Sequence, residues 1–213
     1  MIWQVLTTVL DLTYDSLNSE SVRWCLIGST ATSLQGCSIT PNDIDILTAT
    51  PQGVHHFVHL LDRFTPHTCP FDEEDEERWH SSKAYPVQSG LDPYGYMWHF
   101  ARWFIQGIKT EIAHIVPPDS FRFADAERGI WEGGPEIWRY IATVPFGEFQ
   151  VPVVPLIIQL ETNLSRNLTD RVQEIIHRLN QTGVNPELLQ LCLSRDHVAA
   201  VKSKLKIIPA VNI

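Results

Sequence analysis

The sequence has few cysteines, and their spacing is unlike that of disulfide-rich or zinc-binding proteins. Among its 213 residues four are cysteine, and they form no C-x-x-C pair and no disulfide framework. Cys25 and Cys192 stand among apolar residues, which favours small buried side chains over reactive thiols. We therefore expect free thiols and a cytoplasmic, reducing environment.

Long apolar runs and an excess of basic residues are also missing. No stretch approaches the roughly 20 apolar residues that span a bilayer, and no charged segment leads into an apolar one at the N-terminus. We expect no membrane association. The 16 Lys and Arg residues are outnumbered by 25 Asp and Glu, for a formal net charge of -9. Proteins that coat nucleic acids need clustered basic residues, so bulk duplex is not an expected partner.

The apolar pattern predicts a mixed α/β protein with a helical C-terminal part. Three-and-four spacing predicts a helix at 2–18, a brief helix is expected at 29–34, and Pro51 marks the start of another. The β-prone runs predict strands at 22–27 and 43–47. At least two neighbouring strands are expected between 79 and 116, and a long irregular connection at 117–140. Four helical segments are expected after residue 155. We therefore divide the chain into an α/β core (1–151) and a C-terminal helical region (152–213).

Three clusters have an ordinary interpretation that is favoured over a functional one. The acidic run 72–77 is better explained as a solvated loop than as a docking site for a basic partner. His55 and His59 have the i, i+4 spacing of a metal pair, and His67 lies near Cys69, but no third ligand is evident at either place. The aromatic residues between 79 and 103 suit core packing better than a platform that stacks on a base.

The segment 24–48 carries the strongest chemical pattern. An apolar run ends at Gly28 and Ser29, a short helical segment follows, and Asp43 and Asp45 open a second strand. Alternation places the two carboxylates on the same face of that strand, roughly 6.5–7 Å apart. Such a pair can converge on a divalent cation, and the amides at a helix start favour phosphate. Together these features predict a metal–nucleotide site.

A third carboxylate is expected from a neighbouring strand, and Glu111 is the best candidate. It lies inside the apolar run 107–116, where an acid is costly unless it is paired or bound to metal. Pairing with Lys109 on the same strand face is the structural alternative. Two metal ions about 3.5–4 Å apart, held by two or three carboxylates, would align a nucleophile and stabilise charge in phosphoryl or nucleotidyl transfer.

These residues resemble the DNA polymerase β-like nucleotidyltransferase superfamily, and in particular its small minimal nucleotidyltransferase branch. In that family a glycine with glycine or serine is followed by a spaced Asp-apolar-Asp, as in Gly28-Ser29 and Asp43-Ile44-Asp45. The resemblance implies an α/β (α+β) fold with a mixed sheet flanked by helices, an NTP substrate, with ATP the first choice, and two Mg²⁺ ions, with Mn²⁺ as a substitute.

The resemblance also implies roles for individual residues. Gly28 and Ser29 would hold the triphosphate, and Asp43 and Asp45 would bind metal, with Asp45 bridging both ions. Glu111, on the later apolar strand, would complete the second metal site and accept the proton of the acceptor.

Further positions match the family less completely. The C-terminal helices match at Arg166 and Asp170, but a lysine common in the first of them is absent, with Gln159 and Glu161 near its place. Lys109, Arg166 and Lys83 are possible phosphate contacts, with ordinary surface charge as the alternative for each.

The predicted function is therefore transfer of an NMP from an NTP to a hydroxyl of a small molecule, a protein or an RNA. The acidic net charge favours a small or protein acceptor over bulk RNA. One alternative is a non-catalytic, nucleotide-binding or antitoxin-like partner protein on the same fold. Another is that the fold is as predicted but the acidic residues are structural.

Overall fold

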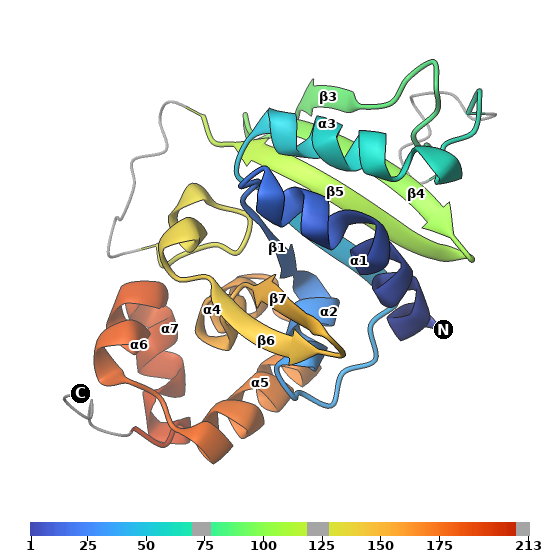
Figure 1. Ribbon diagram of the computed structural model, residues 1–213. Helices are drawn as coiled ribbons and strands as arrows, with labels where there is room; N and C mark the ends of the chain where they lie inside the picture. Colours follow the sequence, from blue (N-terminus) through green and yellow to red (C-terminus); the bar gives the residue numbers. More distant parts are fainter. Residues whose placement is uncertain (70–77, 119–127, 208–213) are drawn as a thin grey trace.

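The computed structural model describes residues 1–69, 78–118 and 128–207, and the acidic run 72–77 lies outside these ranges. The described chain forms a mixed α/β fold around a seven-stranded sheet of order β3-β4-β5-β2-β1-β7-β6 (Figure 1). The strands are β1 (Trp24–Ile27), β2 (Asp43–Thr48), β3 (Gln88–Leu91), β4 (Met97–Ile105), β5 (Ile108–Val116), β6 (Ala142–Phe146) and β7 (Phe149–Val153).

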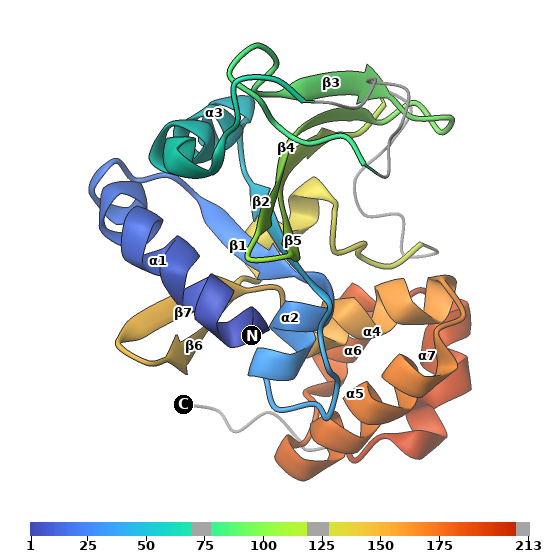
Figure 2. The same ribbon diagram turned by 90° about the vertical axis from the view of Figure 1, so that its right-hand side faces the viewer.

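Helices cover both faces of this sheet. They are α1 (Ile2–Ser19), α2 (Gly28–Leu34), α3 (Pro51–Leu60), α4 (Leu156–Ser165), α5 (Thr169–Thr182), α6 (Pro186–Cys192) and α7 (Arg195–Val201). Helices α1 and α3 lie along one face, and the C-terminal helices lie on the other (Figures 1 and 2). The sheet therefore separates two apolar cores, one on each face. No helix of the described ranges is long and apolar enough to cross a membrane.

The predicted N-terminal elements are confirmed. The apolar stripe of α1 is buried, as the three-and-four spacing requires. Helix α3 begins at Pro51, where a proline costs no hydrogen bond, and the Thr50 side chain accepts a hydrogen bond from the Gly53 amide at 3.3 Å. The predicted helices after residue 155 are also present as α4 to α7.

Strand pairing positions the acidic residues. Strand β1 pairs antiparallel with β2 and parallel with β7, and β2 pairs parallel with β5. In the β2–β5 register Asp45 lies opposite Glu111. Strands β4 and β5 form an antiparallel hairpin in which Arg102 lies opposite Glu111. The Asp-apolar-Asp strand is thus in the middle of the sheet, with the third acid on its neighbour.

The hairpin of β6 and β7 is not among the predicted elements, because the sequence pattern indicates only an irregular connection at 117–140 and helices after residue 155. Proline cannot donate to a sheet ladder, and Pro145 and Pro152 weaken the strand pattern in the two segments. Strand β6 tolerates Pro145 because it is the edge strand of the described sheet, in which it pairs with β7 on one side. Residue 152 lies inside β7, and we retain the division into 1–151 and 152–213 as a proposal.

The aromatic residues between 79 and 103 divide between core and surface. Trp79 and Trp103 are each 1 % exposed, as core packing predicts. The Trp103 indole donates a hydrogen bond to the Thr65 hydroxyl at 2.9 Å, which satisfies its polar atom inside the core. Trp98 and Phe100 are only partly buried and face the opposite core. Those two residues line the cavity described below.

Candidate active site

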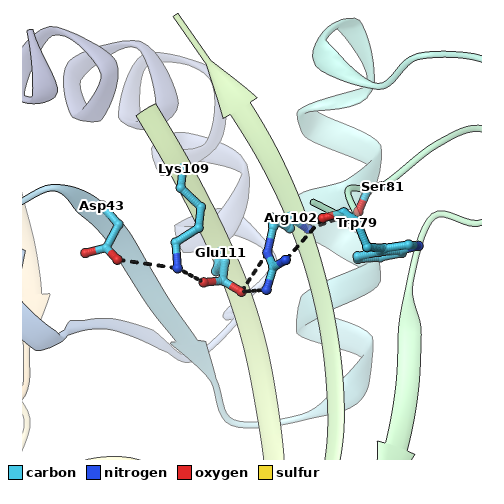
Figure 3. A network of polar contacts seen from close by, with 6 residues as sticks. All are labelled: Asp43, Trp79, Ser81, Arg102, Lys109 and Glu111. Atoms are coloured by element: carbon cyan, nitrogen blue, oxygen red, sulfur yellow. Dashed lines mark hydrogen bonds and ion pairs between the residues drawn. The ribbon is translucent and has the colours of Figure 1, made fainter. Parts of the chain in front are cut away.

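The acids predicted on β2 and β5 share one face of the sheet with basic residues of β4 and β5. The register forms a row of Arg102, Glu111 and Asp45 across three strands. The next row, towards the start of β2, pairs Lys109 with Asp43. Figure 3 shows the side chains of Asp43, Lys109, Glu111 and Arg102 as a continuous chain of contacts. The side-chain contacts therefore alternate between acidic and basic groups, whereas Asp45 and Glu111 are neighbouring acids on adjacent strands.

Glu111 is held by two cations. Its Oε2 lies 2.6 Å from Lys109 Nζ, and its Oε1 accepts hydrogen bonds from Arg102 Nε at 3.0 Å and Nη2 at 2.8 Å. Burial acts to raise the pKa of Glu111, but the contacts with Lys109 and Arg102 outweigh it and hold that pKa below its ordinary value. The pairing of Glu111 with Lys109, considered as the structural alternative, is thus present.

Lys109 and Arg102 are themselves tied to further groups. Lys109 Nζ lies 3.4 Å from Asp43 Oδ2, so this ammonium bridges two acids. Burial acts to lower the pKa of Lys109, but Glu111 and Asp43 outweigh it and raise that pKa. Arg102 Nη1 donates to the Trp79 carbonyl at 3.2 Å, and the Arg102 amide donates to Ser81 Oγ at 3.0 Å (Figure 3). The network is therefore anchored in the segment that precedes β3.

Asp45 differs from Asp43 and Glu111 because no described basic side chain pairs with it. Burial, and then the charges of Asp43 and Glu111, raise its pKa from 3.8 to about 7. Within the described ranges its carboxylate accepts no hydrogen bond and forms no ion pair. A partly buried acid without a partner is costly, which is a common feature of functional sites.

The Gly28-Ser29 turn packs directly against Asp45. Gly28 has φ +62°, and a Cβ placed on it would lie 2.9 Å from Asp45 Oδ2. Glycine is required here by both the backbone conformation and the close approach. The Gly28 amide, predicted to face phosphate, donates to Glu132 Oε2 at 3.1 Å. Ser29 is 4 % exposed, in the first turn of α2.

Glu132 is a functional candidate that the sequence did not reveal. It is buried, and burial raises its pKa although hydrogen bonds from Gly28 and Gln159 act to lower it. Gln159 on α4 donates to Glu132 Oε2 at 3.2 Å and to the Gly28 carbonyl at 2.9 Å. The amide of Gln159 thus joins α4, the glycine turn and Glu132. The only sequence signal was an acid between Trp131 and Gly133 in a segment expected to be irregular.

A cavity of about 340 Å³ opens beside the acids. Its polar wall contains Asp45, Glu111, Glu132, Arg102 and Arg166, and its apolar wall includes Trp98, Phe100, Ile115 and Trp131. Arg166, predicted as a phosphate contact, thus reaches the same cavity from the end of α4.

Other predicted positions lie apart from the acids. Lys83 forms an exposed ion pair with Asp62, and Asp170 is exposed in the first turn of α5. In the described ranges no three His, Cys, Asp or Glu side chains are grouped closely enough to hold a metal ion. The histidines of α3 and the pair His67 and Cys69 are thus in no such group among the described side chains.

The donor chemistry around Asp45 nevertheless fits a hard divalent cation. Asp43 and Asp45 offer carboxylate oxygens, the ligands that Mg²⁺ prefers. The raised pKa of Asp45 arises partly from neighbouring like charges, which a cation would offset. The Lys109 ammonium now lies against Asp43 and Glu111, and its side chain is 34 % exposed, so it has room to move.

The close contact of Gly28 with Asp45 can be tested with a matched pair of glycines. Gly28 and Gly147 have φ values of +62° and +59°, but a Cβ on Gly147 would meet nothing within 4 Å. We expect Gly147→Ala to cost about 1 kcal/mol, because only backbone strain is added. Gly28→Ala should cost at least about twice as much, measured by urea unfolding. Equal losses would show that the contact with Asp45 is unimportant.

Comparison with known proteins identifies a solved structure with a similar fold. No protein-family model and no curated protein matches the chain. A solved structure of a "putative nucleotidyltransferase" from Thermotoga maritima is similar at 21% identity and TM-score 0.51, over 84% of this chain and 92% of that one. The chain therefore shares the fold of this solved structure, and the predicted α/β fold with a mixed sheet flanked by helices is confirmed.

Two further structures are similar at lower scores. Both are of the antibiotic-resistance factor ANT(2″)-Ia, one a crystal structure with adenylyl-2″-tobramycin and one a solution structure. The first is 10% identical with TM-score 0.44, over 94% of this chain and 98% of that one. The second is 11% identical with TM-score 0.45, over 94% and 93%.

Proposed function

We propose that this chain is a metal-dependent nucleotidyltransferase that moves an NMP from an NTP, with ATP the first donor to test, to a hydroxyl. The observation that carries the proposal is the placement of Asp45 opposite Glu111, with Asp43 on the same strand, on a nucleotidyltransferase fold. Asp45 has no partner among the described side chains, and a cavity lies beside it. A purely structural acid would instead be expected to be paired.

Each acid has a distinct part in the proposed reaction. Asp43 and Asp45 would hold Mg²⁺, or Mn²⁺ in its place, and the bound ion would supply positive charge near the oxygens that gain negative charge in transfer. The acceptor hydroxyl oxygen forms a bond to the α-phosphorus, the bond from that phosphorus to pyrophosphate breaks, and pyrophosphate leaves. Glu111 accepts the proton of the hydroxyl.

Basic residues and the glycine turn bind the donor in this proposal. The Gly28-Ser29 turn lies against Asp45 and contributes backbone groups near the triphosphate. Lys109 bridges Asp43 and Glu111, and with a metal held by the acids its ammonium would be available to contact phosphate. Arg166 approaches from α4. Lysine suits such a change of partner because its ammonium is a point charge on a flexible stem.

Transfer of label tests this proposal directly. Each of the four α-labelled NTPs is incubated with the protein and a cell extract, with and without Mg²⁺. We expect Mg²⁺-dependent labelling that Asp43→Asn/Asp45→Asn abolishes and that Asp62→Asn/Asp170→Asn, two exposed acids outside the site, leaves intact. Labelling that survives the first double substitution, or none with any donor, would contradict the proposed activity.

One observation favours a second function. Groups that would have to contact a substrate are already bonded to other residues of the protein. The Gly28 amide already donates to Glu132, and Glu111 is already paired with Arg102 and Lys109. This arrangement suits a non-catalytic, nucleotide-binding or antitoxin-like protein. Mg²⁺–NTP binding to the purified protein without any transfer, together with a stable complex with a protein partner, would favour it.

A further inference from the structure

We propose that the cavity beside Asp45 and Glu111 binds an apolar ring that carries the acceptor hydroxyl, with Trp98, Phe100 and Trp131 as its walls. This inference rests on the proposed nucleotidyl transfer and adds the class of acceptor, an aryl or cyclic alcohol. Arg102, Glu111 and Asp45 form one row of the sheet at one side of the cavity. Most of the other lining residues are aromatic or aliphatic, with Glu132, Thr162 and Arg166 as the polar exceptions.

The floor of the cavity changes from charged to apolar in successive rows of the sheet. The row of Arg102, Glu111 and Asp45 is followed by a row of Phe100, Ala113 and Leu47. Beyond it Trp98 lies opposite Ile115. Side chains in alternate positions of a strand share one face, so these rows form a continuous surface. A ring lying over the apolar rows would present its hydroxyl to Glu111.

The roof is formed by Trp131, which the surrounding structure fixes in place. Its ring lies 6.5 Å from that of Trp98 and 5.3 Å from that of Tyr96, both in edge-on arrangements. A Cβ on Gly133 would lie 2.5 Å from the Trp131 ring, so glycine allows this packing. The Glu132 amide beside it donates to Thr162 Oγ1 at 3.0 Å. The cavity is therefore preformed, which favours tight binding of a rigid ring.

The chemistry of the walls argues against the donor nucleotide as the occupant. Aromatic and aliphatic walls cannot replace the hydration of phosphates or sugar hydroxyls. Of the proposed donor groups, Asp43, Lys109 and the Gly28-Ser29 turn do not contribute to the described cavity wall, whereas Asp45 and Arg166 do, together with Glu111. A volume of about 340 Å³ lies at the small end of ligand pockets, which suits one or two fused rings.

The test uses 2-naphthol as a probe of the cavity in the full chain. Binding is measured by calorimetry without metal or nucleotide, with glycerol as the polar comparison. We expect 2-naphthol to bind, glycerol not to bind, and Trp131→Leu and Phe100→Leu each to weaken 2-naphthol at least tenfold. Trp138→Leu is the matched control, because Trp138 contacts Arg23 and is not part of the cavity wall. Thermal unfolding identifies any variant that fails to fold.

A second experiment separates this inference from the proposed function. Mg²⁺ with a non-hydrolysable ATP analogue is titrated in the presence of saturating 2-naphthol, and labelling of 2-naphthol from the preferred donor is followed in parallel. Simultaneous binding and labelling support the inference. Competition between 2-naphthol and the analogue would assign the cavity to the nucleobase and overturn it. Failure of 2-naphthol to bind, with transfer to other acceptors intact, would overturn it alone. Binding without any transfer would overturn the proposed function and the acceptor assignment with it.

Discussion

Asp45→Asn is expected to reduce nucleotidyl transfer by a factor of about 1,000 or more. Asparagine retains the shape of the side chain but loses the negative charge that holds the cation in the proposed site, and such charge stabilisation is a major contribution to catalysis. Initial rates at saturating Mg²⁺–NTP would measure the loss. Asp11→Asn on α1 serves as the control, since Asp11 is exposed and distant from the acids. A loss below tenfold would remove Asp45 from the proposed metal site.

The same substitution should stabilise the metal-free protein at alkaline pH. The pKa of Asp45 is about 7 in the folded protein against an ordinary 3.8, so the folded state binds a proton more tightly than the unfolded chain does. Its contribution to stability is complete below about pH 4, falls as the pH rises through 7, and is then fully lost. In EDTA at pH 8, Asp45→Asn should therefore raise the free energy of unfolding by about 2–4 kcal/mol.

Urea unfolding at pH 5 and at pH 8 would check the sign of this effect. The gain of Asp45→Asn over the wild-type protein should shrink by more than half at pH 5, where the folded wild-type side chain is already protonated. A gain that is independent of pH would contradict the raised pKa. Greater stability with less activity in one variant would also be the behaviour expected of a functional acid.

Arg102→Met is expected to lower the free energy of unfolding by about 2–4 kcal/mol, because it removes one partner of a largely buried ion pair. The Arg102 side chain is 11% exposed and that of Glu111 is 21% exposed. Without the two hydrogen bonds from Arg102, Glu111 keeps Lys109 as its one partner among the side chains that the structure describes. Transfer should fall at least tenfold as Glu111 loses its orientation, and Arg102→Lys should restore part of the stability but less of the activity.

Lys83→Met is the matched control for this experiment. Lys83 and Asp62 also form an ion pair, but their side chains are 40% and 57% exposed. Exposed pairs contribute about 0–1 kcal/mol, so this variant should be nearly as stable as the wild-type protein. Urea unfolding of both variants would measure the difference. Similar losses in the two would mean that burial of the pair with Glu111 has no energetic consequence.

The acids on β2 and β5 could be predicted from the sequence because each has a local signal. Asp43 and Asp45 alternate with apolar residues after a glycine turn, and Glu111 interrupts an apolar strand. The turn at Gln106 and Gly107, with φ values of +52° and +80°, is a two-residue hairpin connection of the kind that fixes register. The pairing of Glu111 with Arg102 could not be predicted in the same way, because it depends on that register.

The roof of the cavity and the hairpin of β6 and β7 had no comparable local signal. Glu132 is held by Gln159 and Gly28, which are distant in sequence, and neither its burial nor its partners follow from its neighbours. Pro145 and Pro152 weaken the strand pattern in the sequences of β6 and β7, and the pairing of these two strands depends on tertiary contacts. Whether Gly28, Ser29, Lys109 and Arg166 bind nucleotide also stays a prediction.

The parallel pairing of β1 with β7 has a consequence for the order of folding. Leu26 lies opposite Val153, so this contact closes a loop of more than half the chain, whereas β4 and β5 are joined by a tight turn. Contacts between distant segments carry a larger loop-closure entropy and slow folding. We therefore expect the hairpin that carries Arg102 and Glu111 to form early. The glycine turn acquires its contacts with Gln159 only when α4, which follows β7, docks. Nascent chains would thus contain the acids long before they could bind a substrate.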